Sequence, residues 1–187
     1  MEEFLRWEQR QEQKHELIDG VPVLRAIRKG WVGPKAMTGG ARRHTHIATR
    51  IIHLLSERLG DGPCQPAAAD LQVRATEDRS RYPDVVVDCG PIDARLYAEE
   101  PRVVFEVLSP SNDFREQLDL LDDYKRLASI EQIVFVEQRK PLVLWWTRAG
   151  DLWPRREAAG LEAALPVAPF GFELPLSGIY KGVVFDA

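Results

Sequence analysis

The clearest periodic pattern in the chain covers residues 43–59. Apolar side chains recur there at the spacing of one helix face, namely Ile47, Ile51, Leu55 and Leu59. Residues spaced three and four apart share a face of an α-helix, so this segment predicts an amphipathic helix that packs against the core. Gly60 follows directly and suits the end of such a helix.

A second helix is predicted over residues 113–128. Its apolar side carries Leu120, Tyr124 and Leu127. Its acidic residues are expected to be mainly solvated, and these are Asp119, Asp122 and Asp123. The pattern indicates a helix with one face on the protein and one face in water.

Short apolar runs bounded by turn residues lie between and after these helices, and such runs are typical of strands. We predict a central mixed sheet from five of them, residues 68–74, 83–88, 102–108, 132–138 and 142–148. Together the elements indicate a single α/β domain over residues 1–187, with helices flanking a mixed central sheet.

The two ends of the chain carry weaker signals. Residues 2–12 predict a short helix, and the Asp-Gly pair at 19–20 predicts a tight hairpin. The glycine-rich residues 29–41 predict a loop. The tail over residues 170–185 predicts irregular packing with a short helix at 176–180.

Composition narrows the class of protein. The 187 residues carry a formal net charge of −4, which argues against a strongly basic, non-specific nucleic-acid binder. Cys64 and Cys89 have no metal-ligand spacing and make no disulfide framework, so a reducing cytoplasm is expected. Apolar runs such as VVFEVL are too short to cross a bilayer, so no membrane partner is expected.

Three acids stand in unusual strand contexts. Asp84 opens the run VVV, Glu106 lies inside VVFEVL, and Asp70 precedes LQV. Burying a carboxylate without a partner costs on the order of several kcal/mol, so each of these acids needs a cation, a hydrogen-bond donor or a surface position. Two carboxylates from neighbouring strands would suit Mg²⁺ or Mn²⁺. Alternatively, either acid alone simply points into solvent or caps a strand.

Other polar residues allow two interpretations. Glu16 in HELIDG is either a site residue or a solvated carboxylate, and His44 in RRHTHI is either a ligand or a hydrogen-bonded histidine at a helix start. Arg42 and Arg43, with Lys35, could contact phosphate, but solvated loop charges are the favoured interpretation.

Several stretches, in this order, resemble the Uma family of restriction-endonuclease-like proteins, in the PD-(D/E)xK nuclease superfamily. They include HELIDGVPV, MTGGARRHTHIATRIIHLL, DLQVR, YPDVVVDCGP, VVFEVLSPSN, DYKRLASIEQIVFVEQ and LPLSGIYKGV. The resemblance covers almost the whole chain. It implies a mixed central sheet flanked by helices, and a divalent metal ion used to cleave DNA.

The resemblance also assigns residues. Asp84 matches the metal-binding aspartate of the family, and Glu106 matches its second acid. Glu16 matches an amino-terminal glutamate near the site, so the three carboxylates are expected to converge. Asp70 and His44 match family positions of less certain role.

The chain departs from the family pattern where a lysine is expected. The position two residues after the second acid is Leu108, and the helix position four residues before Tyr124 is Leu120. Leucine cannot orient a water or neutralise developing negative charge. Gln117 lies on the same helix and could donate a hydrogen bond, without a charge.

Two hypotheses follow for the function. One is a divalent-metal-dependent nuclease-like protein acting on DNA phosphodiesters, with Asp84 and Glu106 as metal ligands and Glu16 and Gln117 assisting. The other is a catalytically inactive domain that keeps the fold for binding or assembly, for example as a homodimer. The missing lysine favours weak or lost activity.

Overall fold

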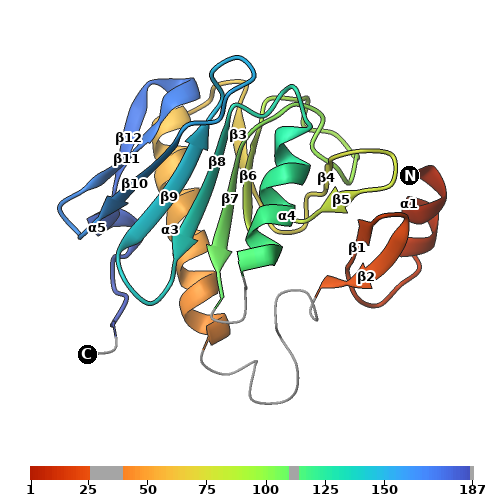
Figure 1. Cartoon of the computed structure of the whole chain (residues 1–187), viewed down its shortest axis with the longest axis horizontal. Coiled ribbons are helices and arrows are strands. Elements are labelled where there is room, and N and C mark those ends of the chain that lie inside the picture. The colour runs from red at the N-terminus through yellow and green to blue at the C-terminus, as the bar shows by residue number, and fades with distance from the viewer. Residues whose placement is uncertain (26–39, 110–113, 186–187) are drawn as a thin grey trace.

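A six-stranded mixed sheet forms the centre of the molecule (Figure 1). The computed structural model describes residues 1–25, 40–109 and 114–185, without the side chains of residues 40 and 41. The strand order is β10-β9-β8-β7-β6-β3. The strands are β3 (Gln65–Ala68), β6 (Val85–Asp88), β7 (Pro101–Leu108), β8 (Gln132–Glu137), β9 (Leu142–Thr147) and β10 (Arg155–Ala159). Neighbouring strands run antiparallel except for β7 and β8, which are parallel.

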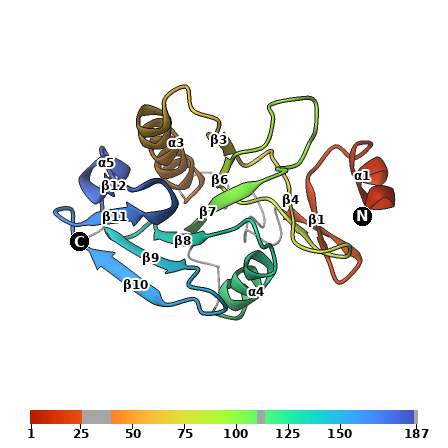
Figure 2. The same cartoon turned by 90° about the horizontal axis from the view of Figure 1, so that it is seen from above.

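Helices cover both faces of this sheet (Figure 2). Successive strand residues point to opposite faces, so in β7 Val103, Phe105 and Val107 pack on one side. That side holds α3 (Gly40–Leu59), on which Ile47, Ile51 and Leu55 are fully buried and Leu59 is partly buried, together with α5 (Leu176–Ile179). Val104 and Leu108 pack on the other side, against α4 (Phe114–Lys125). Because β7 and β8 are parallel, α4 forms the crossover between them.

A second, four-stranded sheet lies beside the central one, in the order β2-β1-β5-β4, with α1 (Glu2–Glu8) near the N-terminus (Figure 1). Its strands are β1 (His15–Ile18), β2 (Val21–Leu24), β4 (Val73–Arg74) and β5 (Ser80–Arg81). The turn between β1 and β2 has positive φ at Asp19 and Gly20, 50° and 75°. This is the backbone of a two-residue hairpin turn, so the predicted hairpin is confirmed.

Two sequence-based expectations for the strands were wrong. Residues 68–74 do not form one strand, because β3 ends at Ala68 and β4 begins at Val73 in the other sheet. The tail contains a hairpin where irregular packing was expected. It consists of β11 (Ala164–Val167) and β12 (Phe172–Pro175), joined through the 3₁₀ helix η1 (Ala168–Phe170).

The predicted helices are present with shifted ends. The first begins at Gly40 and the second runs from Phe114 to Lys125. Asp123 is 0% exposed, although it was expected in solvent, because it faces two arginines from the neighbouring sheet. Most of the predicted loop at 29–41, namely residues 29–39 with Lys35, lies outside the described residues. Position 113, the expected start of the second helix, lies outside them as well.

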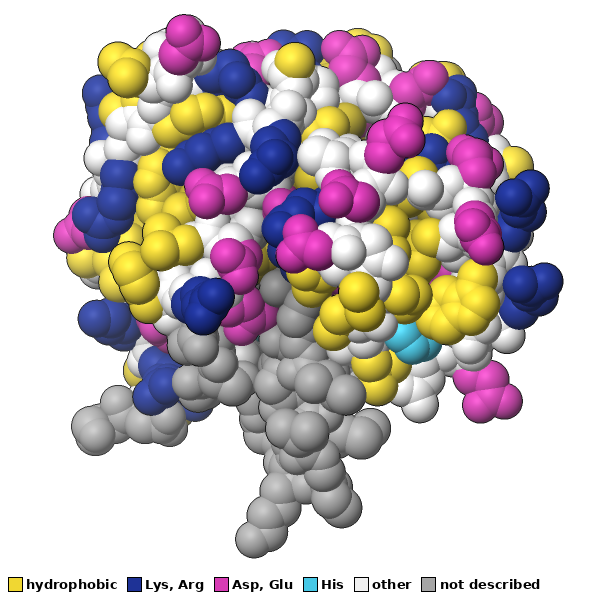
Figure 3. Space-filling view, turned by 45° about the vertical axis from the view of Figure 1, so that its right-hand side comes forward, with side chains coloured by type: hydrophobic (Ala, Val, Ile, Leu, Met, Phe, Trp, Pro, Cys, Tyr) yellow, Lys and Arg dark blue, Asp and Glu magenta, His cyan; other side chains and the backbone are white. Residues whose placement is uncertain are grey.

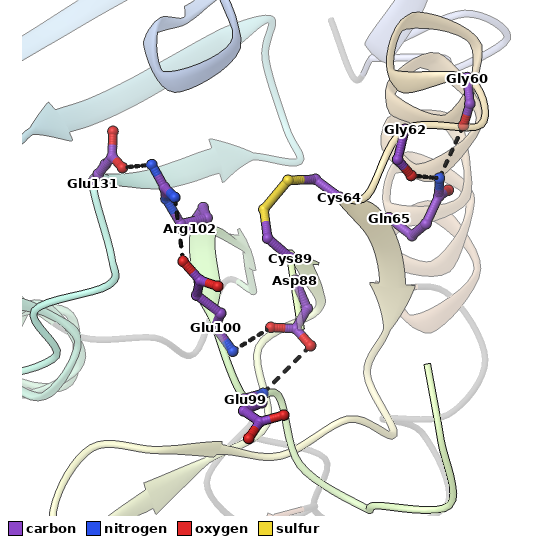
Figure 4. Close-up of a disulfide and its surroundings, with 10 residues drawn as sticks. All are labelled: Gly60, Gly62, Cys64, Gln65, Asp88, Cys89, Glu99, Glu100, Arg102 and Glu131. Atoms are coloured by element: carbon purple, nitrogen blue, oxygen red, sulfur yellow. Dashed lines mark hydrogen bonds and ion pairs between the residues drawn. A yellow bond between two sulfur atoms is a disulfide. The ribbon is translucent and has the colours of Figure 1, made fainter. Parts of the chain in front are cut away.

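A disulfide joins the start of β3 to the end of β6 (Figure 4). Gln65 pairs with Asp88, so Cys64 and Cys89, one residue further along each strand, stand opposite one another. Asp88 also accepts hydrogen bonds from the backbone N–H groups of Glu99 and Glu100. The expectation of no disulfide is therefore corrected, because strand register brings together cysteines 25 residues apart in the sequence.

This bond gives a test of stability. A disulfide that closes a loop of this length restricts the unfolded chain and typically stabilises a fold by about 2–4 kcal/mol. Reduction with dithiothreitol is expected to lower the thermal unfolding midpoint, and the variant C64A/C89A should start lower and not respond to the reductant. Calorimetry with and without reductant checks this. Equal midpoints for the wild type in both conditions would contradict the prediction.

Candidate functional site

Asp84 and Glu106 stand opposite one another on adjacent strands. In the antiparallel pair of β6 and β7, Val85 pairs with Phe105 and Val86 with Val104. Extending this register by one residue places Asp84 across from Glu106, on the sheet face shared with Val86 and Val104. Side chains directly opposite in an antiparallel pair have Cβ atoms about 4.5–5.5 Å apart. The structure therefore brings together the two acids predicted as metal ligands.

The Asp84 carboxylate is buried, with 2% of the residue exposed, and several groups contact it. The backbone N–H of Val107 donates to Oδ2 at 2.8 Å. Nη2 of Arg25 donates to Oδ1 at 3.2 Å, and Nε2 of His44, from the start of α3, lies 3.0 Å from Oδ2. The two hydrogen bonds and the nearby His44 ring offset the cost of removing the negative charge from water. His44 thus belongs to the site through Asp84.

Glu106 is 1% exposed and faces α4. The hydroxyl of Tyr124 donates a hydrogen bond to its Oε1 at 2.6 Å. Tyr124 is itself fully buried, so the apolar side of α4 delivers one polar group to the carboxylate. Sequence analysis placed Tyr124 on the apolar side of the helix and used it as a marker of the family pattern, and the structure gives it a contact in the site.

Glu16 has partners that differ from those of Asp84 and Glu106. It is 0% exposed, and its Oε2 accepts a hydrogen bond from Nη1 of Arg81 at 3.2 Å. Its Oε1 accepts from the backbone N–H of Tyr82 at 3.2 Å, two residues before Asp84. Among the described residues, no three histidine, cysteine, aspartate or glutamate side chains form a group that could hold a metal ion.

Arg81 and Asp123 are functional candidates that sequence analysis missed. Nε of Arg81 donates to Oδ2 of Asp123 at 2.6 Å, and its Nη2 contacts the same oxygen. Arg79 donates to Oδ1 of Asp123 at 3.0 Å. The signal available in the sequence was the basic residue directly before YPD. Nothing in the acid-rich helix distinguishes Asp123 from the acids around it.

Tyr82 anchors the segment before Asp84 to the N-terminal helix. Its hydroxyl donates to the Glu8 carboxylate, 2.8 Å from Oε1 and 2.7 Å from Oε2. Burial, and then the negative Glu8, raise the pKa of the Tyr82 hydroxyl above its usual value. The hydroxyl therefore stays protonated and acts as a donor at any ordinary pH.

The remaining predicted residues lie around this centre. Gln117 is half-buried on α4, two turns before Tyr124. Asp70 is exposed on the turn after β3, and it lines a surface pocket of about 430 Å³ along that edge strand. Leu108 and Leu120, at the two family lysine positions, are 7% and 1% exposed and belong to the apolar cluster under α4.

The two carboxylates still suit one cation. Mg²⁺ is commonly held by one or two carboxylates, with water and substrate phosphate oxygens completing its shell, so a three-residue protein cage is not required. Hard oxygen ligands on adjacent strands match this chemistry. Asp84 and Glu106 therefore fit a divalent cation.

Basic side chains gather at the same end of the sheet. Because β7 and β8 are parallel, Arg139 and Lys140, which follow β8, lie near the end of β7. Nε2 of Gln138 donates to the backbone oxygen of Leu108 at 2.8 Å, which joins the two strand ends directly. The turn that carries these two cations is thus at the same end of the sheet as Glu106.

Two further cations come from the helices of the opposite face. Lys181 follows Tyr180, whose hydroxyl donates to the backbone oxygen of Glu137 at 2.8 Å. Arg42 lies in the first turn of α3, two residues before His44. We call Arg42, Arg139, Lys140 and Lys181 the basic rim. Within the described ranges, no ion pair joins any of them to a carboxylate.

On the face shown in Figure 3, acidic and basic side chains are intermixed. The basic rim is thus carried by a chain whose formal net charge is −4. Across the described residues, the search for a helix of sufficient length and apolarity to span a membrane found none.

Comparison with known proteins identifies the family and the fold of the chain. Residues 1–177 match the Uma2 family, described as "Putative restriction endonuclease". The chain is 35% identical over 115 residues to the uncharacterized protein slr1290 of Synechocystis sp. (strain ATCC 27184 / PCC 6803 / Kazusa). That match covers 60% of this chain and only about half of the relative, 54%.

A solved structure has the same fold. It is described as a "putative nuclease belonging to DUF820" from Anabaena variabilis ATCC 29413, and it aligns with a TM-score of 0.72 over 98% of both chains. At 16% sequence identity this likeness speaks for the fold alone. The resemblance seen in the sequence and the mixed sheet flanked by helices are confirmed, and the chain belongs to the Uma2 family with a restriction-endonuclease-like fold.

Proposed function

We propose that this protein is a divalent-metal-dependent, nuclease-like protein that acts on DNA phosphodiesters. The observation that carries the proposal is the opposed pair Asp84 and Glu106, which lies at the same end of the sheet as the basic rim. A cation site next to groups that attract phosphate is the combination that hydrolysis of a phosphodiester needs.

Each residue has a role in this proposal. Asp84 and Glu106 hold Mg²⁺ or Mn²⁺, which when bound supplies an activated water and positive charge at phosphorus. Tyr124 keeps the Glu106 carboxylate in place, and Val107 does the same for Asp84. Glu16 supports the pair through the backbone of Tyr82. Gln117 offers an uncharged donor from α4.

The proposed activity is weak. The two positions where the family places lysine hold Leu108 and Leu120, both buried in apolar surroundings. Loss of one positioned donor that stabilises transition-state charge costs on the order of a hundredfold to a thousandfold in rate. Cleavage of duplex DNA with Mg²⁺ is therefore expected to be very slow.

A second candidate is a catalytically inactive domain that binds or assembles, for example as a homodimer. The contacts around Asp84 favour it, because Arg25 and His44 already supply positive or polar groups to both of its oxygens. In such a protein the carboxylates would be structural. Metal binding separates the two candidates.

The first prediction from the proposed function concerns the metal. Wild-type protein is expected to bind Mn²⁺ in a calorimetric titration, and Asp84→Asn should weaken binding by about tenfold or more, since even outer partners of a metal site are worth 10–100-fold. Asp88→Asn, on the far end of the same strand, is the matched control and should bind normally. Wild-type protein that binds no Mn²⁺ would support the inactive domain instead.

The second prediction concerns the missing lysine. Leu120→Lys is expected to increase the rate of Mg²⁺-dependent DNA cleavage, measured as loss of supercoiled plasmid. It should also lower stability, because Leu120 is 1% exposed and a lysine there must remain largely buried.

The adjacent core residue supplies the control for this substitution. Leu121 is 4% exposed and also belongs to the cluster under α4. Leu121→Lys should lose stability in the same way without any gain in cleavage. If Leu120→Lys behaves like this control, position 120 is only a core position.

The third prediction concerns the basic rim. The variant R139Q/K140Q should bind duplex DNA more weakly and reduce the slope of log affinity against log salt by about 2, one for each lost phosphate contact. R155Q/R156Q removes the same charge at the opposite end of the sheet, since β10 begins opposite Trp146. Fluorescence anisotropy over a salt series measures both. Equal slopes for the two variants would exclude the rim as a DNA surface.

A further inference from the structure

Arg81 sits between two carboxylates in the interior of the protein. It is 1% exposed, and Glu16 and Asp123 are both 0% exposed. Its Nη1 donates to Glu16 at 3.2 Å, and its Nε donates to Asp123 at 2.6 Å. The planar guanidinium therefore contacts β1 with one edge and α4 with the other.

The cluster holds Asp123 on both oxygens. Oδ2 contacts Arg81, while Oδ1 accepts from the less buried Arg79 at 3.0 Å. The buried part of the cluster also includes Glu16, and Arg79 makes a further ion pair with the exposed Asp19. A carboxylate bound on both oxygens by two donors from β5 and the residue before it has little freedom to rotate, so α4 has a fixed position against that strand.

Burial of this cluster does not by itself favour the fold. Removing paired charges from water costs on the order of several kcal/mol per ion. Apolar residues of similar volume often give equal or higher stability. What paired charges add is a unique arrangement, because their hydrogen bonds tolerate few geometries. The arrangement fixed here is the register between the segment 80–84 and α4.

Both sides of the cluster lead directly to the proposed metal ligands. Arg81 comes three residues before Asp84, in the segment that Glu16 also holds through Tyr82. Asp123 comes directly before Tyr124, whose hydroxyl contacts Glu106 at 2.6 Å. A shift of α4 relative to this segment would move the donor on Glu106 relative to Asp84.

We propose that Arg81 is a positioning residue of the site, which sets the Asp84 and Glu106 carboxylates relative to one another by joining Glu16 and Asp123. This inference rests on the proposed function, in which those carboxylates bind a divalent cation. It assigns Glu16 an indirect role, through Arg81 and Tyr82, in place of direct contact with the cation or its water.

The test uses variants chosen to fold. Arg81→Met alone leaves Glu16 buried without its cation and is expected to be strongly destabilised. The double variant E16Q/R81M removes one charge of each sign and leaves Asp123 paired with Arg79. Arg81→Lys keeps the positive charge but loses the planar set of guanidinium donors. Glu16→Gln alone leaves the contact between Arg81 and Asp123 in place. Thermal unfolding first confirms that each variant is folded.

Arg148→Met is the matched control for loss of support at α4. Arg148 donates to the backbone oxygens of Lys125, Leu127 and Ile130 at the end of this helix, outside the cluster. Its loss should lower stability and leave the site unchanged.

Two measurements read out the position of the site. Calorimetry with Mn²⁺ gives the affinity, and the ¹³Cζ resonance of Tyr124, assigned with Tyr124→Phe, reports its hydrogen bond in the metal-free protein. We expect E16Q/R81M to lose 10–100-fold in affinity and to shift the Tyr124 resonance. Arg81→Lys should be intermediate, and Glu16→Gln should lose less affinity than the double variant.

Each other outcome has a definite meaning. If folded E16Q/R81M keeps wild-type affinity and the Tyr124 resonance, the proposal is wrong. If Glu16→Gln alone loses as much affinity as the double variant, Glu16 acts directly and the proposal is again wrong. If wild-type protein binds no Mn²⁺, the proposed function fails, and the Tyr124 resonance alone decides whether Arg81 positions α4.

Discussion

A carboxylate that leaves water must find a cation or a hydrogen-bond donor, and this constraint organises the interior of the protein. Five acids are buried within the described residues, namely Glu8, Glu16, Asp84, Glu106 and Asp123. Their partners come from distant parts of the chain, so each interaction joins two elements. The α1 helix, the β1–β2 hairpin and α4 are all held to the segment around Tyr82 and Asp84 in this way. The same interactions that fix the architecture therefore define the candidate site.

The relation between Asp84 and its neighbours bears on how a cation would enter. Arg25 and His44 contact the two oxygens of Asp84. A divalent cation would repel the positively charged arginine and could use the histidine as a ligand. Binding a metal thus has to compete with protein groups that already neutralise the carboxylate. In the proposed nuclease, this competition would lower the affinity of the free protein for a divalent cation. Both candidate functions are compatible with these contacts. In the nuclease-like protein Asp84 would bind the cation, and in the inactive domain it would stay with Arg25 and His44.

The sequence predicted those features that depend on local patterns. Periodicity located both long helices, and the Asp-Gly pair located the hairpin, because side-chain spacing and positive φ are local properties. The opposition of Asp84 and Glu106 could be anticipated from neighbouring strands and the family pattern. The burial of Asp123 could not, since a helical pattern shows which face is apolar but not which acid meets Arg79 and Arg81, more than 40 residues earlier. Residues 68–74 were misassigned because an apolar run does not reveal that its two halves join different sheets.

The disulfide encloses the part of the chain that matters most for the site. The loop from Cys64 to Cys89 contains β3 to β6 and therefore carries Arg79, Arg81 and Asp84. With the bond closed, this loop has fewer conformations available when it detaches from the rest of the sheet, so partial opening regains less entropy. Amide hydrogens within the loop would then exchange with solvent mainly through unfolding of the whole molecule. In the reduced protein the same amides could exchange through a smaller, local opening, so oxidation state determines whether the site comes apart separately or only with the entire fold.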